Sequence, residues 1–330
     1  MLMSATENLS IFDPASPSAE SIRGLFILVI AITGGILALV EGVLIYTLIR
    51  GKRRQGNRDA EPPQVYGSKP IEIAWTAAPA LVVFVLILLV GRVIWEVRVD
   101  IDKPPAGSKP LYVTVIGRQW WWEYRYETYD GRTLNFTTAN ELHIPVSEPG
   151  QPRPVYLNLQ SADVCHSFWV PRLGGKTDLL PGRVNTMWLQ TNEAGLHLGQ
   201  CAEYCGTQHA NMLIRVVAES PAEFDAWCQH EAANAVDDAS VKAGRDLFLN
   251  TSCVNCHAVR GTMAKGTYAP DLTHLMSRQT LASGMIPNTP ENLKKWVVNP
   301  NSIKPGCLMP GFALKDSEMN LVIDYLKTLK

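Results

Sequence analysis

Two long apolar segments near the start of the chain constrain its fold more than any other feature. Residues 73–91 form an uncharged apolar run of nineteen residues, which is long enough to cross a bilayer as a helix. Residues 24–49 form a second apolar run that is interrupted only by Glu41. We therefore expect a transmembrane helix hairpin over residues 24–97, with Glu41 facing protein because a carboxylate is costly against lipid.

The charges beside these runs predict the orientation of the hairpin. The connection over residues 50–72 holds six basic residues, whereas the leading tail, residues 1–23, holds one. Basic residues mark the cytoplasmic side, so both chain ends are expected on the outer (periplasmic) face of a bacterial plasma (inner) membrane. The first run lacks a basic n-region and a cleavage site, so we do not expect it to be a removed signal peptide. The net charge of −1 gives no basic footprint for nucleic acid.

The segment that follows the hairpin, residues 98–225, is predicted to be an all-β domain. Apolar and polar residues alternate in several short runs, and Pro and Gly separate the runs. This spacing is typical of a Greek-key sandwich or barrel. The expected strands lie at residues 112–116, 155–159, 186–190 and 213–217.

Soft metal ligands are concentrated within one short part of this domain. Cys201, Cys205, His209 and Met212 follow one another within twelve residues, and His166 precedes them in a separate segment. Thiolate and thioether sulfurs combined with imidazole are the ligands that copper selects. A second cysteine one loop turn from the first allows both sulfurs to bridge two metals, with one histidine for each. The pattern therefore favours a dinuclear copper site over a mononuclear one.

Two simpler interpretations of Cys201 and Cys205 stay open at this point. A disulfide would suit an exported domain. A zinc site takes Cys and His at similar spacings. Neither interpretation needs Met212 or the distant His166, which is why copper is favoured.

A second redox motif lies near the C-terminus. Cys253, Cys256 and His257 form a C-x-x-C-H sequence, which is typical of covalent c-type haem attachment with the histidine as axial ligand. In a reducing compartment such a pair could instead be redox-active or bind zinc, but this domain is expected to be exported and no second Cys pair follows. We predict a linker over residues 226–239 and an all-α haem domain over residues 240–330.

The sixth haem ligand is expected downstream of the motif. The sequence offers several side chains, but Met309 lies in a rigid Pro/Gly loop just before the last predicted helix, residues 316–329. This arrangement resembles a class I cytochrome c, in which a Met/His pair gives a high potential. By the same resemblance the carbonyl of Pro270 orients the axial histidine, and Trp296 lines the haem or packs in the core. The other candidates are Met263, Met276, Met285 and His274.

Four motifs resemble those of subunit II of cytochrome c oxidase, and they occur in that family's order between about Gly24 and Phe224. In that family the twelve-residue cluster carries the copper A (CuA) centre, and the domain is a cupredoxin. The motifs are Gln119–Tyr124 (QWWWEY), Ser161–Ser167 (SADVCHS), Lys176–Arg183 (KTDLLPGR) and Gly199–Gly206 (GQCAEYCG).

The resemblance implies roles for individual residues. Glu203 would ligate copper through its backbone carbonyl. The side-chain copper ligands would be His166, Cys201, Cys205, His209 and Met212. The Glu203 carboxylate would reach a magnesium ion shared with subunit I. Trp120 would be the surface tryptophan through which electrons enter the copper site. Glu72 would stand at the entrance of a proton path into subunit I, or simply mark the start of a helix.

Hairpin, cupredoxin and cytochrome c together resemble subunit II of caa3-type cytochrome c oxidases. Such a chain relays electrons from haem c to CuA and on to subunit I, where oxygen is reduced and protons are pumped. The implied partners are subunit I, subunit III, membrane lipid, and an upstream donor such as a cytochrome bc complex or another c-type cytochrome. A CuA-bearing subunit of a membrane nitric oxide reductase is the alternative, since the discriminating residues lie in the partner chain.

The two redox domains carry opposite charge. Residues 110–225 have a net charge of −4, and residues 240–330 have a net charge of +5. Opposite charges would steer the haem domain onto the predicted copper domain, residues 98–225. We expect the haem domain to meet the face that carries Trp120.

Overall fold

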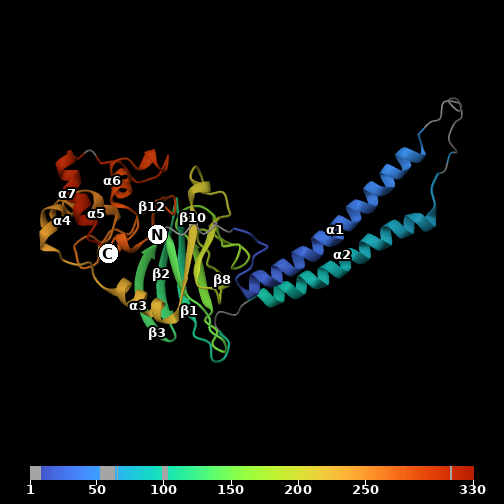
Figure 1. Ribbon diagram of the computed structural model, residues 1–330, viewed down its shortest axis with the longest axis horizontal. Helices are drawn as coiled ribbons and strands as arrows, with labels where there is room; N and C mark the ends of the chain where they lie inside the picture. The colour runs from blue at the N-terminus through green and yellow to red at the C-terminus, as the bar shows by residue number, and fades with distance from the viewer. Residues whose placement is uncertain (1–8, 53–63, 65, 99–102, 313) are drawn as a thin grey trace. The chain divides into compact units, whose positions relative to one another are not determined.

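The computed structural model describes residues 9–52, 64, 66–98, 103–312 and 314–330 (Figure 1). The chain divides into two compact units, one comprising residues 20–98 and the other residues 1–19 together with 99–330. The first unit is the apolar hairpin, and the second holds both redox domains. The predicted fold class, a two-helix hairpin followed by a β domain and a helical domain, is confirmed.

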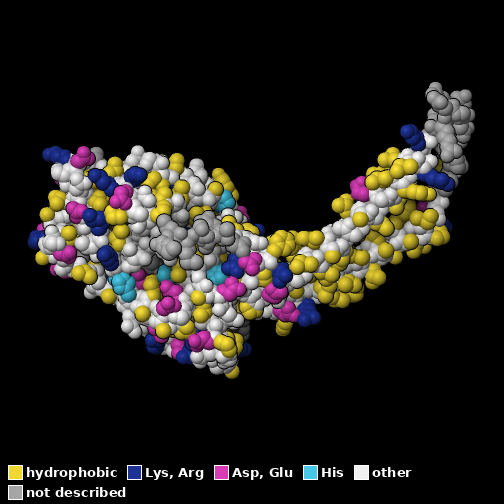
Figure 2. Space-filling view, in the orientation of Figure 1, with side chains coloured by type: hydrophobic (Ala, Val, Ile, Leu, Met, Phe, Trp, Pro, Cys, Tyr) yellow, Lys and Arg dark blue, Asp and Glu magenta, His cyan; other side chains and the backbone are white. Residues whose placement is uncertain are grey.

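The hairpin consists of helices α1 (Pro17–Arg50) and α2 (Lys69–Val97). Both are long and apolar enough to cross a membrane, and their apolar side chains are exposed, as the yellow surface of the hairpin in Figure 2 shows. Helix α1 begins seven residues before the expected apolar run, since Pro17 suits the first helical turn. Part of the basic connection, including Arg53, Arg54 and Arg58, lies outside the described residues.

The segment before α1 is hydrogen-bonded to the copper domain. The amide of Ala15 donates to the carbonyl of Arg172 at 2.8 Å, and the Ser16 hydroxyl donates to the carbonyl of Leu173 at 2.8 Å. The Arg172 guanidinium in turn reaches the carbonyl of Asp13 at 2.9 Å. Because this tail touches the copper domain directly, both must lie on the same side of any membrane that the hairpin crosses, as the charge pattern predicts.

The copper domain is a sandwich of two five-stranded sheets. The first sheet has the order β3-β2-β1-β5-β8, and the second has the order β4-β10-β9-β6-β7. Most neighbours are antiparallel, but β1 pairs with β5 and β4 pairs with β10 in parallel. All four predicted strands are present. The bounds are β1 Leu111–Arg118, β2 Trp121–Tyr129, β3 Arg132–Ala139, β4 Glu141–Pro145, β5 Val155–Ser161, β6 His166–Trp169, β7 Thr177–Leu179, β8 Asn185–Leu189, β9 Gly195–Cys201 and β10 Leu213–Glu219.

An aromatic core between the sheets reaches the metal-ligand cluster. Trp122, Tyr124 and Tyr126 alternate along β2 with their side chains fully buried. The Trp122 ring lies 5.6 Å from Phe168 and 6.1 Å from the imidazole of His166, measured between centroids, in edge-on geometry. Packing of the core therefore fixes the strand that begins at His166.

The predicted linker, residues 226–239, is wrong in its first half. Helix α3 (Pro221–Ala232) runs through it, and only residues 233–238 connect the domains without helix or strand. Ser220 and Glu223 form a capping box with Pro221 at the first helical position. Phe224 and Cys228 lie one helical turn apart, and both side chains are buried in the core of the copper domain. This packing holds helix α3 against the domain.

The haem domain is built from short helices around a second core. Its elements are η2 Ala239–Val241, α4 Lys242–Leu249, α5 Cys253–Cys256, η3 Leu275–Ser277, α6 Pro290–Val298, η4 Pro300–Ser302 and α7 Asp316–Leu326, with a minimal strand pair of β11 Thr280–Leu281 and β12 Ile286–Pro287.

Helices α4 and α7 cross at close contact in this domain. A Cβ atom at Gly244 would lie 2.0 Å from the carbonyl oxygen of Leu321, so only glycine permits the crossing. The last helix ends at Leu326, three residues before the predicted end. The amides of Thr328 and Leu329 bond three residues back, and the carbonyl of Leu329 accepts from Met276 instead of continuing the helix.

Candidate metal and haem sites

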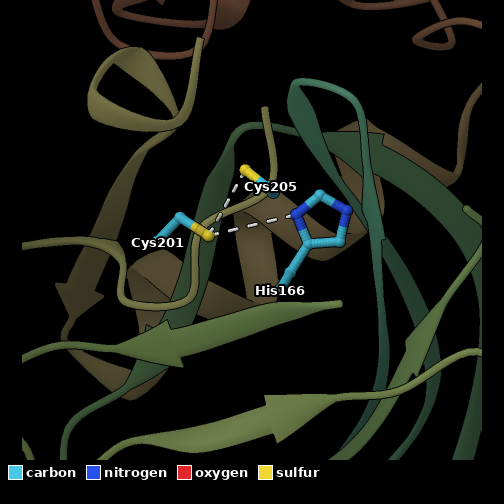
Figure 3. Close-up of side chains that lie close together, drawn as sticks. All are labelled: His166, Cys201 and Cys205. Atoms are coloured by element: carbon cyan, nitrogen blue, oxygen red, sulfur yellow. Dashed lines mark hydrogen bonds between the residues drawn. The ribbon is translucent and has the colours of Figure 1, made fainter. Parts of the chain in front are cut away.

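The sequence-predicted copper ligands converge at one end of the β-sandwich. His166 begins β6, Cys201 ends β9, and Cys205 lies in the loop that leads to β10. Figure 3 shows the Cys201 sulfur facing both the Cys205 sulfur and the His166 ring. The two cysteine sulfurs are 3.8 Å apart, and Cys201 Sγ is 3.9 Å from His166 Nδ1.

The remaining predicted donors complete the group around the second sulfur. Cys205 Sγ lies 3.6 Å from His209 Nδ1 and 3.8 Å from Met212 Sδ. The carbonyl oxygen of Glu203 lies 3.2 Å from Cys201 Sγ. Each sulfur thus has one imidazole beside it, and the thioether and the carbonyl lie at opposite ends of the group.

These separations fit donors that share metal ions. Two metal–ligand bonds of about 2.0–2.3 Å at a tetrahedral angle place their donors roughly 3.3–3.8 Å apart. Cys201 and Cys205 are free thiols rather than a disulfide. The hydrogen bond between the two sulfurs lowers the pKa of Cys201, while the same bond and burial raise the pKa of Cys205. A soft cation binds thiolates, so its binding would displace any proton that the sulfur pair still carries.

Asp163 orients the His166 imidazole and was not singled out from the sequence. Its carboxylate lies 2.7 Å from Nε2 of His166, so Nδ1 faces the sulfurs as the ligating nitrogen. Burial is the largest single effect and lowers the pKa of His166, but the hydrogen bonds and charges of Asp163 and Cys201 together outweigh it, so the net shift is upward. Gly117 lies against the ring, since a Cβ there would be 2.8 Å from His166 Cδ2.

Trp120 does not lie on the surface, in contrast to the prediction. Its side chain is 9% exposed, because the haem domain covers it. The indole Nε1 donates to the carbonyl of Cys205 at 2.9 Å, and the side-chain Nε2 of Gln119 donates to the same carbonyl at 2.7 Å. The predicted contact between the haem domain and the Trp120 face is therefore confirmed, although no ion pair joins the two domains in the described part of the chain.

A cavity of about 450 Å³ lies beside the C-x-x-C-H motif of the haem domain. Cys253, Cys256 and His257 line it, and so does Met309 from the opposite loop. Met309 is the only methionine among the described residues that lines the cavity. Trp296 also contributes to the wall, as one of the two sequence interpretations holds.

The predicted axial histidine, His257, is oriented by Pro270 as the sequence predicts. His257 Nδ1 lies 2.7 Å from the carbonyl oxygen of Pro270, so it donates its proton there and leaves Nε2 free. Burial lowers the pKa of His257, which favours the neutral ring that a metal needs. Gly266 packs against the C-x-x-C-H backbone, where a Cβ would lie 2.4 Å from the carbonyl carbon of Cys256. The motif, the cavity and the oriented imidazole together fit a covalently attached haem.

The copper domain supplies one wall of the same cavity. Trp120 and Trp121 line it, together with Arg118 and Asp163. A haem in this cavity would therefore face the residue that is hydrogen-bonded to the copper-ligand loop. The sequence predicts that the haem domain meets the face that carries Trp120, but it does not predict that this face lines the haem cavity.

The other predicted residues lie outside these two centres. The carboxylate of Glu203 is exposed, and Glu72 is exposed at the start of α2 in the separate hairpin unit. His197 is a structural residue, bonded to Arg172 at 3.3 Å and to the carbonyl of Glu193 at 3.0 Å. His143 stacks on Trp227 with ring centroids 4.3 Å apart.

Family models match three consecutive parts of the chain. The transmembrane domain of cytochrome c oxidase subunit II matches residues 4–90, and its periplasmic domain matches residues 111–219. A cytochrome c model matches residues 241–330. Cytochrome c oxidase subunit 2 of Alkalihalophilus pseudofirmus is 37% identical over 98% of this chain and 92% of its own length. The chain belongs to the cytochrome c oxidase subunit II family.

Other subunit II proteins are similar to all or part of this chain. Cytochrome c oxidase subunit 2 of Bacillus subtilis is 33% identical over 98% of this chain and 92% of its own length. The solved periplasmic domain of subunit II from Bradyrhizobium japonicum is 29% identical, with a TM-score of 0.33, and the match covers 37% of this chain and 92% of that one.

As a subunit II with a fused cytochrome c domain, the chain is an electron-transfer component of a haem-copper oxidase. Its two domain types imply copper A and haem c as cofactors, and subunit I as a partner. It is a membrane subunit whose redox domains lie outside. The names of these relatives do not favour the nitric oxide reductase alternative.

Proposed function

We propose that this subunit II holds two copper ions with six residues of the sandwich end. The cysteine sulfurs would bridge the metals, each imidazole would bind one of them, and the thioether and a backbone carbonyl would complete the set. When bound, such a centre accepts and releases one electron with little rearrangement. The proposed ligands are His166, Cys201, Glu203 (carbonyl), Cys205, His209 and Met212.

The haem domain would hold one haem c through four residues. Cys253 and Cys256 would form the thioether links, with His257 and Met309 as axial ligands. A haem bound in this way carries one electron at high potential. The Pro270 carbonyl would keep the His257 ring in one orientation, and the apolar cavity wall would exclude water.

Trp120 would connect the two centres. It lines the haem cavity, and its indole donates to the carbonyl of a proposed copper ligand, Cys205. This single observation carries the proposal that the chain's own haem domain, rather than a diffusing cytochrome c, is the immediate donor to the copper domain. A soluble cytochrome c would find the Trp120 face already covered.

Further partners are proposed from the resemblance to caa3-type oxidases. A cytochrome bc complex or another c-type cytochrome would deliver electrons to the haem domain, and subunit III would accompany subunit I. The exposed carboxylate of Glu203 would reach a magnesium ion at the interface with subunit I, and Glu72 would serve proton entry. The membrane would be the bacterial plasma membrane, with both chain termini on its outer face.

Flash reduction of the haem in the purified oxidase tests this proposal. Electron transfer to the copper domain should be first order and independent of protein concentration, because donor and acceptor belong to one chain. A rate that scales with concentration would contradict it. So would full turnover on soluble cytochrome c after truncation of the chain at Ala239.

A further inference from the structure

A lysine of the haem domain is buried against the copper domain. Lys304 is 3% exposed, and its ammonium donates to the carbonyl oxygens of Trp120 at 2.7 Å, Asn211 at 2.9 Å and Ala282 at 3.3 Å. An ammonium group has three protons, so all of its donors have acceptors. No salt bridge pairs Lys304 with a carboxylate in the described part of the chain. Two of its three acceptors belong to the other domain, which a lysine serving only its own core would not need.

A carboxylate of the copper domain makes the reverse contact elsewhere in the interface. Glu141 is 2% exposed. Its oxygens accept from the backbone amides of Gln279 and Thr280, both at 2.9 Å, and from the Thr280 hydroxyl at 2.7 Å. Arg215 lies behind it at 3.6 Å and donates to the Gln279 side chain at 2.8 Å. Each domain thus places one buried ionisable side chain against backbone groups of the other.

Lys304 also connects the two loops that carry the proposed ligands. It begins the Pro/Gly loop that leads to Met309, and its acceptor Asn211 immediately precedes Met212. One residue further on, the carbonyl of Pro305 accepts from Gln208 at 2.6 Å, which lies between Cys205 and His209. The contacts of this lysine therefore fix the haem-ligand loop relative to the copper-ligand loop.

We propose that Lys304 is a positioning residue for electron transfer between the domains, and that with Glu141 it locks the haem domain in one docked arrangement. This inference rests on the proposed function, since it concerns the path from the haem cavity to the copper ligands. The domains would then behave as one rigid donor–acceptor pair rather than as two tethered modules. The lock consists of hydrogen bonds between buried charges and backbone, which salt screens less than surface ion pairs.

The test compares Lys304→Met with Lys295→Met in the purified oxidase complex. Methionine keeps much of the buried stem but removes all three donors, whereas Lys295 is exposed on α6 of the same domain. Hydrogen exchange is measured at the amides of Gln279 and Thr280, which contact Glu141 rather than Lys304. We expect exchange there to rise about tenfold or more in Lys304→Met, because hydrogen bonds to charged groups are lost and the domains separate more often. Electron transfer after flash reduction should slow, with the haem potential and the copper absorption unchanged.

Equal exchange and equal transfer rates in Lys304→Met and Lys295→Met would overturn the lock. If Lys304→Met loses haem or copper, the variant Glu141→Gln tests the lock instead. The glutamine places its own NH₂ donor opposite one of the backbone amide donors, so a hydrogen bond to Glu141 is lost. That variant should speed exchange at the amide of Asn211, on the Lys304 side of the interface, and wild-type exchange there would also overturn the proposal. A wild-type transfer rate that depends on protein concentration would instead contradict the proposed function, and the exchange results would still report on the lock.

Discussion

The indole of Trp120 and the backbone of Cys205 are joined by a hydrogen bond of 2.9 Å. The same indole lines the haem cavity, so one side chain touches both the haem site and the copper-ligand loop. Gly206 allows this approach, because a Cβ there would lie 2.9 Å from the Trp120 ring. In the proposed function, this contact would give electrons a direct route that stays inside one chain.

Replacement of Trp120 by phenylalanine should slow electron transfer from haem to copper. The variant keeps an aromatic ring but loses the indole donor, and the lost hydrogen bond costs about 1 kcal/mol in holding the loop. Flash-reduction kinetics measure the effect, and copper content should stay near that of the wild type. Trp121→Phe is the matched control, since Trp121 lines the same cavity but its ring contacts Arg118 rather than the ligand loop. Equal slowing in both variants would contradict a specific role for Trp120.

The sequence predicts the ligand groups well because sulfur and imidazole donors are identifiable by type and spacing. All six proposed copper donors and the pair of His257 and Met309 converge as expected. The orientation of His257 by the Pro270 carbonyl is also confirmed. These ligand groups can be predicted because each depends on residues close together in the sequence or on a motif with a fixed residue spacing.

The interface between the domains could not be predicted in the same way. Lys304 and Glu141 bind backbone carbonyls and amides, which every residue carries and which leave no pattern in the sequence. The charge balance of the domains indicates that they attract, but it does not distinguish a buried lysine from an exposed one. Likewise, the sequence predicts a linker from residue 226, whereas helix α3 continues to Ala232 with Cys228 buried in the core.

Replacement of Met309 by alanine should lower the haem potential and open the iron to carbon monoxide. A thioether ligand stabilises ferrous haem, and axial ligands set haem potentials over roughly 0.8 V. A redox titration should show a fall that is a substantial part of this range. Met263→Ala is the control, since Met263 is 73% exposed. If Met309→Ala keeps the wild-type potential and excludes carbon monoxide, another residue is the ligand.

Purified protein should contain two copper ions and one haem per chain. Two bridging sulfurs with one imidazole each provide for two metals, and the single C-x-x-C-H motif provides for one haem. Metal analysis gives the ratio, and a haem stain on a denaturing gel tests covalent attachment. A copper-to-haem ratio near one would contradict the dinuclear site, and loss of haem on denaturation would contradict the thioether links.

Replacement of Gly117 by alanine should displace the His166 ring and weaken copper binding. The new methyl group would lie 2.8 Å from the ring, and overpacking of this kind typically costs about 1–3 kcal/mol. Copper content and the visible spectrum should both change, while haem content stays constant. Gly174→Ala is the matched control, because its Cβ would lie 3.9 Å from the nearest side chain. A wild-type copper spectrum in Gly117→Ala would show that the ring is not held at this contact.

The thiol of Cys228 should resist alkylation in the folded protein. It is 5% exposed within the core beside α3, and burial raises its pKa to about 12. The reactive thiolate is therefore scarce at pH 8, and the reagent has little access. Iodoacetamide at pH 8 followed by peptide mass analysis should modify Cys228 only after unfolding, whereas the partly exposed Cys165 serves as an internal comparison.

The same raised pKa predicts an alkaline loss of stability. The unfolded thiol ionises near pH 9 and the folded thiol near pH 12, so the unfolded state gains charge first and stability falls as pH rises between these values. Denaturant unfolding of the wild type and of Cys228→Ala across pH 8–10.5 measures this difference. The variant should be less stable at pH 8 because it loses buried volume, but its stability should decline less steeply with pH. Parallel pH profiles would mean that Cys228 is not held protonated in the folded core.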